Sequence, residues 1–142
     1  AWDLGWQGST ADQSFLNGTL GVQTPSNGST DDDAGTYSAA GSGGGIFDGI
    51  SVDFSDGSSE TLYDVDFPDL IKPTSGSQTI MTYTGGTGDG ESAAISLTST
   101  GKVIVMGFPF EAILDSADRN AIILAAENFF GGSASVEDWT IF

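Results

Sequence analysis

Apolar and polar residues alternate through the middle of the chain. In residues 46–55, for example, Ile50, Val52 and Phe54 fall on one side of an extended backbone and their polar neighbours on the other. A period of two is typical of half-buried strands. Four segments share it, with Gly- and Ser-rich turns between them: residues 46–55, 60–67, 78–84 and 91–99. Their spacing predicts an antiparallel meander or a pair of hairpins.

The last third of the chain has a different pattern. Residues 102–107 carry a continuous apolar run, which predicts a strand buried on both faces, as in a parallel sheet covered by helices. Residues 116–130 then predict a largely buried helix, with Asp115 or Ser116 as its cap and Gly131 at its end. Four residues share its predicted inner face: Ile122, Ala126, Phe129 and Phe130.

The start of the chain is less regular. Residues 11–21 predict a short helix that stops at Gly21, and residues 23–45 predict a loop with a short strand near Tyr37. Together the elements favour an α/β fold, a mixed sheet with inserted antiparallel hairpins and a buried C-terminal helix. A β-sandwich with one helix is the alternative. We expect one domain over residues 1–132, and a final strand or linker over residues 133–142.

Composition narrows the possible functions. The chain has 20 acidic and 3 basic residues, a net charge of −17. Such a charge repels nucleic-acid phosphates and anionic membranes but favours divalent cations. Cysteine and histidine are both absent, which excludes the usual zinc sites, thiol nucleophiles and imidazole bases. No apolar run approaches the ~18 residues needed for a membrane span.

Residues 101–111, GKVIVMGFPFE, lead into a helix that contains Arg119 and ends in two phenylalanines. With the opening AWDLGW and the following DQSFLNGTLGV, this stretch resembles the second half of a class I glutamine amidotransferase-like domain, a flavodoxin-like version attached to secreted bacterial hydrolases. The resemblance places Glu111 at the family's glutamate, and Pro109 and Phe110 where its histidine would stand. With no cysteine either, it implies the fold without the chemistry, and a first half of the sheet that precedes Ala1 or lies on another chain.

Several carboxylates are candidates for a site. Calcium takes six to eight oxygen ligands, and closely spaced aspartates in Gly-rich loops can supply them, although none of these loops has the EF-hand spacing. The candidate calcium ligands are Asp31, Asp32, Asp33, Asp53, Asp56 and Asp89. A solvated acidic loop is the other interpretation of each group. For Glu111 we expect a structural role, either accepting backbone N–H groups at the helix start or pairing with Arg119.

The sequence therefore predicts a non-catalytic accessory or binding domain of a secreted bacterial protein. Its expected partners are the missing N-terminal half, a parent protein, neighbouring copies or a glycan that stacks on aromatic rings. Nucleic acid and a membrane span are not expected. A self-assembling subunit of an extracellular filament or layer is the alternative, and a hydrolase that uses carboxylates is a third hypothesis. Sequons at Asn17 and Asn27 permit N-glycosylation.

Overall fold

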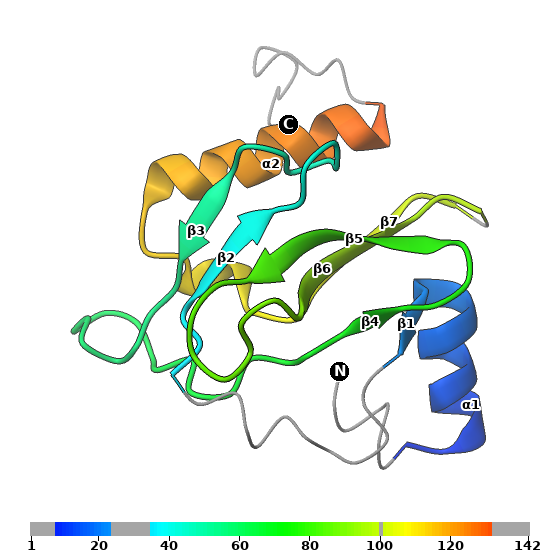
Figure 1. Cartoon of the computed structure of the whole chain (residues 1–142), viewed down its shortest axis with the longest axis horizontal. Coiled ribbons are helices and arrows are strands. Elements are labelled where there is room, and N and C mark those ends of the chain that lie inside the picture. The colour runs from blue at the N-terminus through cyan, green and yellow to red at the C-terminus, as the bar shows by residue number, and fades with distance from the viewer. Residues whose placement is uncertain (1–7, 24–34, 100, 132–142) are drawn as a thin grey trace, which may run out of the picture.

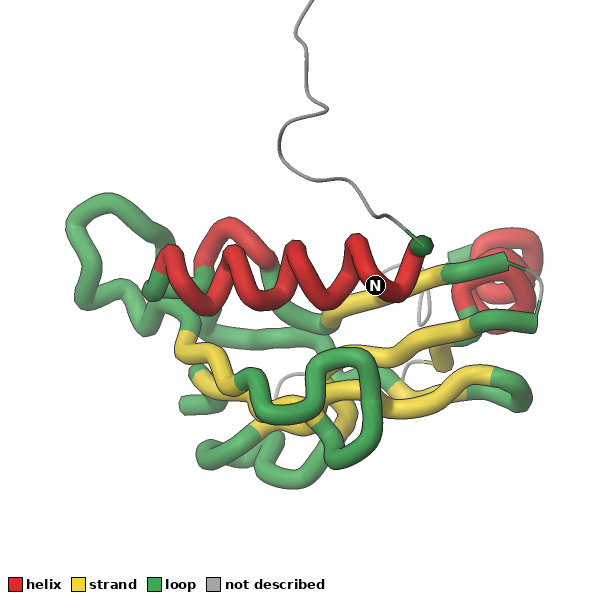
Figure 2. The backbone as a smooth tube through the Cα atoms, turned by 90° about the horizontal axis from the view of Figure 1, so that it is seen from above, coloured by secondary structure: helices red, strands yellow, loops and turns green. Residues whose placement is uncertain are grey.

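A computed structural model describes residues 8–23, 35–99 and 101–131. Its main element is a five-stranded antiparallel sheet in the order β3-β2-β5-β6-β7. These strands are β2 (Ser38–Gly41), β3 (Ser51–Asp53), β5 (Ser77–Tyr83), β6 (Ser92–Leu97) and β7 (Val103–Met106). Helix α2 (Ser116–Phe130) lies along one face of this sheet, as Figures 1 and 2 show from two directions.

A smaller unit covers part of the other face. It contains α1 (Thr10–Ser14), a π-helical turn η2 (Phe15–Leu20), and a two-stranded sheet of β1 (Val22–Gln23) and β4 (Lys72–Pro73). Val22, Ile71 and Ile95 form a small buried cluster between these strands and the main sheet. Because β6 contributes to this cluster and to the larger core, all its residues are buried.

The larger core fills the space between the sheet, α2 and the loops that follow β3 and β7. Phe54 and Phe108 stack in it, with ring centroids 5.1 Å apart and planes inclined by 8°. Tyr83 meets both rings edge-on, at 6.4 and 6.3 Å. From α2, Ile122 is buried against this core, whereas Ile123 and Leu124 point outward and are 43% and 56% exposed. The helix is therefore buried along a narrow stripe only.

The boundaries of α2 follow from local chemistry. The Asp115 carboxylate accepts a hydrogen bond from the Ala117 amide at 2.7 Å, the usual role of an N-cap. The helix ends at Gly131, whose φ of 91° suits glycine best. The Lys102 ammonium donates to the carbonyl of Phe129 at 2.6 Å, which ties the helix end to the start of β7.

The α/β class, the antiparallel hairpins and the C-terminal helix are confirmed, as is the strand near Tyr37. Three details are wrong. The predicted inner face of α2 holds for Ile122 but not for Phe130, which is 52% exposed, so the helix is less buried than predicted. Strand β7 is a half-buried, antiparallel strand at the sheet edge, and the strand buried on both faces is β6. Residues 60–67 form no strand, because Val65 alone enters the core while Tyr63 and Phe67 stay 54% exposed. The predicted segment 133–142 lies outside the described residues.

Candidate functional site

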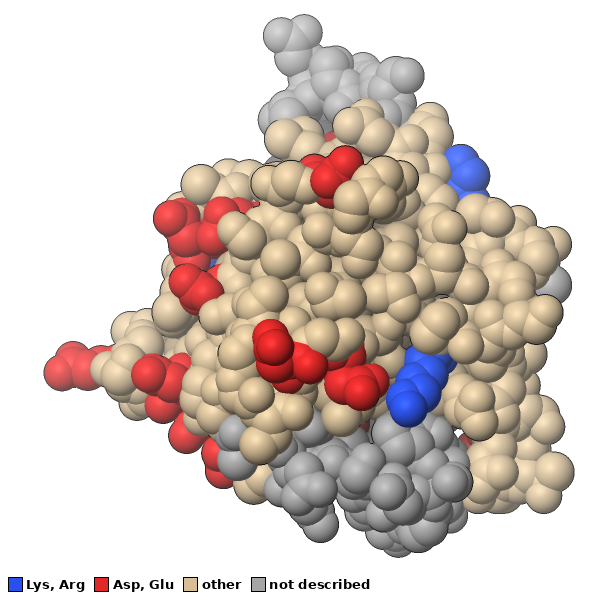
Figure 3. Space-filling view, in the orientation of Figure 1, with Lys and Arg blue, Asp and Glu red and all other residues tan. Residues whose placement is uncertain are grey.

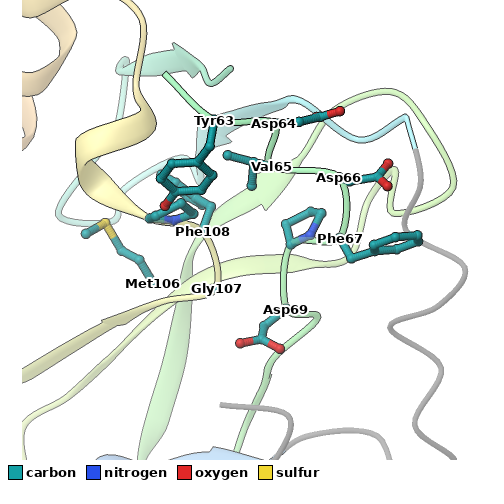
Figure 4. A pocket seen from close by; sticks show the side chains of 11 residues that line it. Tyr63, Asp64, Val65, Asp66, Phe67, Asp69, Met106, Gly107 and Phe108 are labelled. Atoms are coloured by element: carbon teal, nitrogen blue, oxygen red, sulfur yellow. The ribbon is translucent and has the colours of Figure 1, made fainter. Parts of the chain in front are cut away.

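An open cleft lies where the loop of residues 63–69 passes the end of β7 (Figure 4). Its volume is about 520 Å³. Aromatic and acidic side chains account for most of its lining, and no basic residue is among them. The lining residues are Tyr63, Asp64, Val65, Asp66, Phe67, Pro68, Asp69, Met106, Gly107, Phe108 and Pro109.

The cleft depends on a close approach of two backbones at Gly107. The amide of Asp69 donates to the carbonyl of Gly107 at 2.7 Å, and the Tyr83 hydroxyl donates to the carbonyl of Asp69 at 2.9 Å. A Cβ atom on residue 107 would stand 2.1 Å from that Asp69 oxygen and 2.7 Å from the Tyr83 hydroxyl. Only glycine therefore lets the loop lie against the strand end.

The loop is also held at its other end. The amide of Val65 donates to the carbonyl of Ser55 at 2.9 Å, and the Val65 side chain is 6% exposed. Below the cleft, Phe108 is stacked on Phe54 inside the core. The cleft thus has a fixed floor and anchored ends, although its wall is a loop and not a strand.

Two tyrosine–carboxylate pairs order the rim. The Tyr63 hydroxyl donates to Glu111 Oε1 at 3.1 Å, and the Tyr37 hydroxyl donates to Asp64 Oδ1 at 2.9 Å. The bond to Asp64, then desolvation and the charges of Asp64, Asp66 and Asp56, raise the pKa of Tyr37 to about 12. Desolvation, then the bond to Glu111 and its charge, raise the pKa of Tyr63. Both phenols therefore stay protonated at neutral pH.

Glu111 and Arg119 lie close to this region but not as an ion pair. Glu111 belongs to the short 3₁₀ turn η4 (Phe110–Ala112), is exposed, and accepts its hydrogen bond from Tyr63. The Arg119 guanidinium instead donates to the carbonyl of Ile113, and to that of Leu114 at 3.4 Å. It thereby joins the first turn of α2 to residues 113–114, which precede the helix. Among the described residues, Glu111 therefore makes neither of the two predicted contacts, because its partner is Tyr63 and not Arg119 or an amide at the helix start.

The three candidate calcium ligands that the structure describes, Asp53, Asp56 and Asp89, belong to no group that could hold a metal ion. Asp53 accepts from the Ser38 hydroxyl at 2.6 Å across β2 and β3, Asp56 from the Ser58 amide at 3.0 Å, and Asp89 from the Gly85 amide at 2.8 Å. Bonds from Ser58 lower the pKa of Asp56. Asp31, Asp32 and Asp33 lie outside the described residues. Within the described part of the chain, no three acidic side chains are grouped so that they could hold a metal ion.

The sequence pattern predicts a strand over residues 60–67 and does not predict the part that residues 63–69 play in a cleft. One signal was available: acidic and aromatic residues are interleaved there, in YDVDFPD, with a proline that disfavours a central strand. The second wall, Met106 to Pro109, could not be matched to it, because the two segments meet only through tertiary contacts.

Acidic charge is unevenly spread over the surface. In the view of Figure 3, Asp and Glu gather toward the side of the loop that follows β3, and the clearly visible basic side chains lie on the other side. The cleft belongs to the acidic region, since Asp64, Asp66 and Asp69 line it. No helix among the described residues is long and apolar enough to cross a membrane.

Comparisons with known proteins define the fold and little beyond it. No protein-family model and no curated protein matches the sequence. One solved structure, a beta-galactosidase from Rahnella sp. R3, is similar over 80% of this chain with a TM-score of 0.51 and 15% sequence identity. The match spans 15% of the galactosidase chain. The architecture therefore also occurs as a small part of a much longer polypeptide.

Proposed function

We propose that this chain is a non-catalytic accessory domain of a secreted bacterial protein and that it binds a partner through the cleft of residues 63–69 and 106–109. The observation that carries the proposal is the cleft itself: half-exposed aromatic rings and carboxylates on an anchored loop. Pockets of mixed apolar and polar lining are the usual places for ligands.

The chemistry of the rim supports binding over catalysis. The chain has neither cysteine nor histidine, so a hydroxyl nucleophile at the cleft would lack its common base. One oxygen of Asp64 and one of Glu111 accept hydrogen bonds from tyrosines whose pKa values are raised. These phenols are poor general acids or bases at neutral pH, because they hold their protons firmly.

The galactosidase match supports the accessory role in a limited way. A fold that forms 15% of a longer chain there is compatible with a domain that serves a larger protein here. Its partners in this proposal are the rest of a parent protein or a glycan, outside the cell, and Asn17, an exposed residue of η2, is the described glycosylation candidate.

A panel of chromogenic glycoside, ester and peptide substrates tests the absence of catalysis. We expect no turnover above that of buffer. Turnover that is lost in Glu111→Gln, while Glu127→Gln on α2 retains it, would establish a carboxylate-dependent hydrolase and overturn the proposal.

A self-assembling structural subunit is the second candidate. It is favoured by the outer face of α2, where Ile123, Leu124 and Phe130 are 43%, 56% and 52% exposed, and by the edge position of β7. Exposed apolar patches and open strand edges promote association. Light scattering distinguishes the candidates: a monomer at millimolar concentration excludes assembly, and growing polymers exclude a purely accessory domain.

Calcium remains part of the proposal as a bound ion of the acidic loops. A cation that binds only the folded state raises the melting temperature. We expect EDTA-treated protein to melt at a higher temperature after millimolar calcium is added, and an unchanged melting curve would remove calcium from the proposal.

A further inference from the structure

We propose that the cleft accepts the guanidinium group of an arginine side chain presented by a partner polypeptide. The proposal rests on the proposed function only in taking this cleft as the binding site. It adds the chemical class of the group bound, which neither the fold nor the comparisons assign.

Aromatic surface is the first requirement for such a site. The Phe67 ring is 54% exposed, and Figure 4 shows it projecting from the loop on the same side as Asp66. An exposed phenylalanine on an anchored loop offers its negative π-face to a cation, and guanidinium groups stack on aromatic faces more readily than ammonium groups because they are planar and weakly hydrated.

A carboxylate beside the ring is the second requirement. Asp66 lines the cleft, is exposed, and has no hydrogen-bond partner among the described residues. It differs in this respect from Asp64, one oxygen of which is occupied by Tyr37. The two oxygens of a carboxylate can accept two parallel N–H groups from a guanidinium, an arrangement that an ammonium group cannot reproduce.

The charge around the cleft is negative and therefore favours a cationic group. No basic side chain lines the cleft, and two of the three basic residues are engaged elsewhere, Lys102 with Phe129 and Arg119 with Ile113. The carboxylates of Asp64 and Asp69 reinforce the negative field. The cleft is also open and shaped by the fixed contact at Gly107, so a side chain could enter without unfolding the loop.

A pair of peptides that differ in one charge tests the proposal: acetyl-Gly-Arg-Gly-amide and the same peptide with neutral citrulline, which has nearly the same shape. Each is titrated into the full chain and followed by amide chemical shifts. For the arginine peptide we expect shifts confined to residues 63–69 and 106–111, with a Kd on the order of ten millimolar. We expect the citrulline peptide to bind about tenfold more weakly.

Variants then locate the two contacts. Asp66→Asn removes the charge at constant size, and Phe67→Leu removes the ring but keeps an apolar side chain. Each variant should weaken binding of the arginine peptide about fivefold. Glu127→Gln, on α2, changes the net charge by the same amount as Asp66→Asn and should leave the affinity for the arginine peptide unchanged. Both cleft side chains are exposed, so the variants should fold, which the dispersion of their amide spectra verifies.

Three outcomes would overturn the proposal. Equal binding of the two peptides would mean that charge is not recognised. Shifts spread over all acidic loops would mean general electrostatic attraction. Tighter binding of a neutral oligosaccharide such as cellotriose, with the same shifts, would assign the cleft to glycans. None of these outcomes produces turnover, so failure here is distinguishable from failure of the proposed non-catalytic function.

Discussion

Replacement of Gly107 by alanine tests how the cleft is built. A Cβ at this position would stand 2.1 Å from the Asp69 carbonyl oxygen, far inside van der Waals contact, and 2.7 Å from the Tyr83 hydroxyl. Neither neighbouring atom can move aside easily, because the Asp69 oxygen belongs to the backbone and the Tyr83 side chain is buried. The loop must therefore move away, which breaks the bonds from Asp69 to Gly107 and from Tyr83 to Asp69, of 2.7 and 2.9 Å.

The cost follows from these contacts. Each lost hydrogen bond destabilises by about 1 kcal/mol, and the overpacking adds ~1–3 kcal/mol. Alanine also reduces the conformational entropy of the unfolded chain, which offsets ~0.4–1 kcal/mol of this loss. We expect Gly107→Ala to lower the free energy of unfolding by about 2–5 kcal/mol, a large part of the ~5–15 kcal/mol typical of a domain.

Urea denaturation measures this change, with an unaltered m-value as evidence that the two end states are the same. Gly43→Ala is the matched control, since a Cβ there meets nothing within 4 Å and the residue has no positive φ. It should stay within ~0.5 kcal/mol of the parent chain. If Gly107→Ala is as stable as this control, the close approach of loop and strand is refuted, and the cleft with it.

Three further predictions concern single contacts. Asp115→Ala removes the cap of α2 and should destabilise the chain by ~0.5–2 kcal/mol in the same urea assay, whereas Asp115→Asn, which keeps an accepting oxygen, should lose much less. Lys102→Met removes the ammonium group that donates to the Phe129 carbonyl and lies 5.5 Å from the centroid of the Phe129 ring. We expect faster amide hydrogen exchange at residues 127–130, because the last turn of α2 loses this contact. Unchanged exchange would contradict a stabilising role for the Lys102 contact. The pKa of Tyr37 is raised to about 12 in the folded chain, so the unfolded chain loses this proton first and stability should fall as the pH rises from about 10 to about 12. Absorbance at alkaline pH should show a late-titrating tyrosine whose pKa falls toward the ordinary value in Asp64→Ala, although desolvation and the charges of Asp66 and Asp56 remain. Titration of Tyr37 near pH 10 in the parent chain would be inconsistent with its bond to Asp64.

The sequence alone determined the features that depend on neighbouring residues. Asp115 and Gly131 mark the ends of α2 because a cap and a left-handed glycine act within one turn; the sequence predicts Gly131 as the end and Asp115 or Ser116 as the cap. The alternation of Val52 and Phe54 with polar residues likewise predicted which side chains of this segment are buried. Val52 lies in β3, and Phe54, which follows the strand, forms an isolated bridge with Ile113. Composition fixed the charge and the absence of thiol and imidazole groups.

Only the tertiary structure decided which strand is central and where a cleft forms. Residues 103–106 look more apolar than residues 92–97, yet β6 occupies the interior because it has a partner on each side and a cluster on each face. Residues 60–67 alternate like a strand but pair with none. Their place is set by the bond from Val65 to Ser55 and, just after them, by the bond from Asp69 to Gly107, and both bonds join residues that are not neighbours in the sequence. Periodicity reports which side chains can be buried, but the partner that buries them is a property of the folded chain.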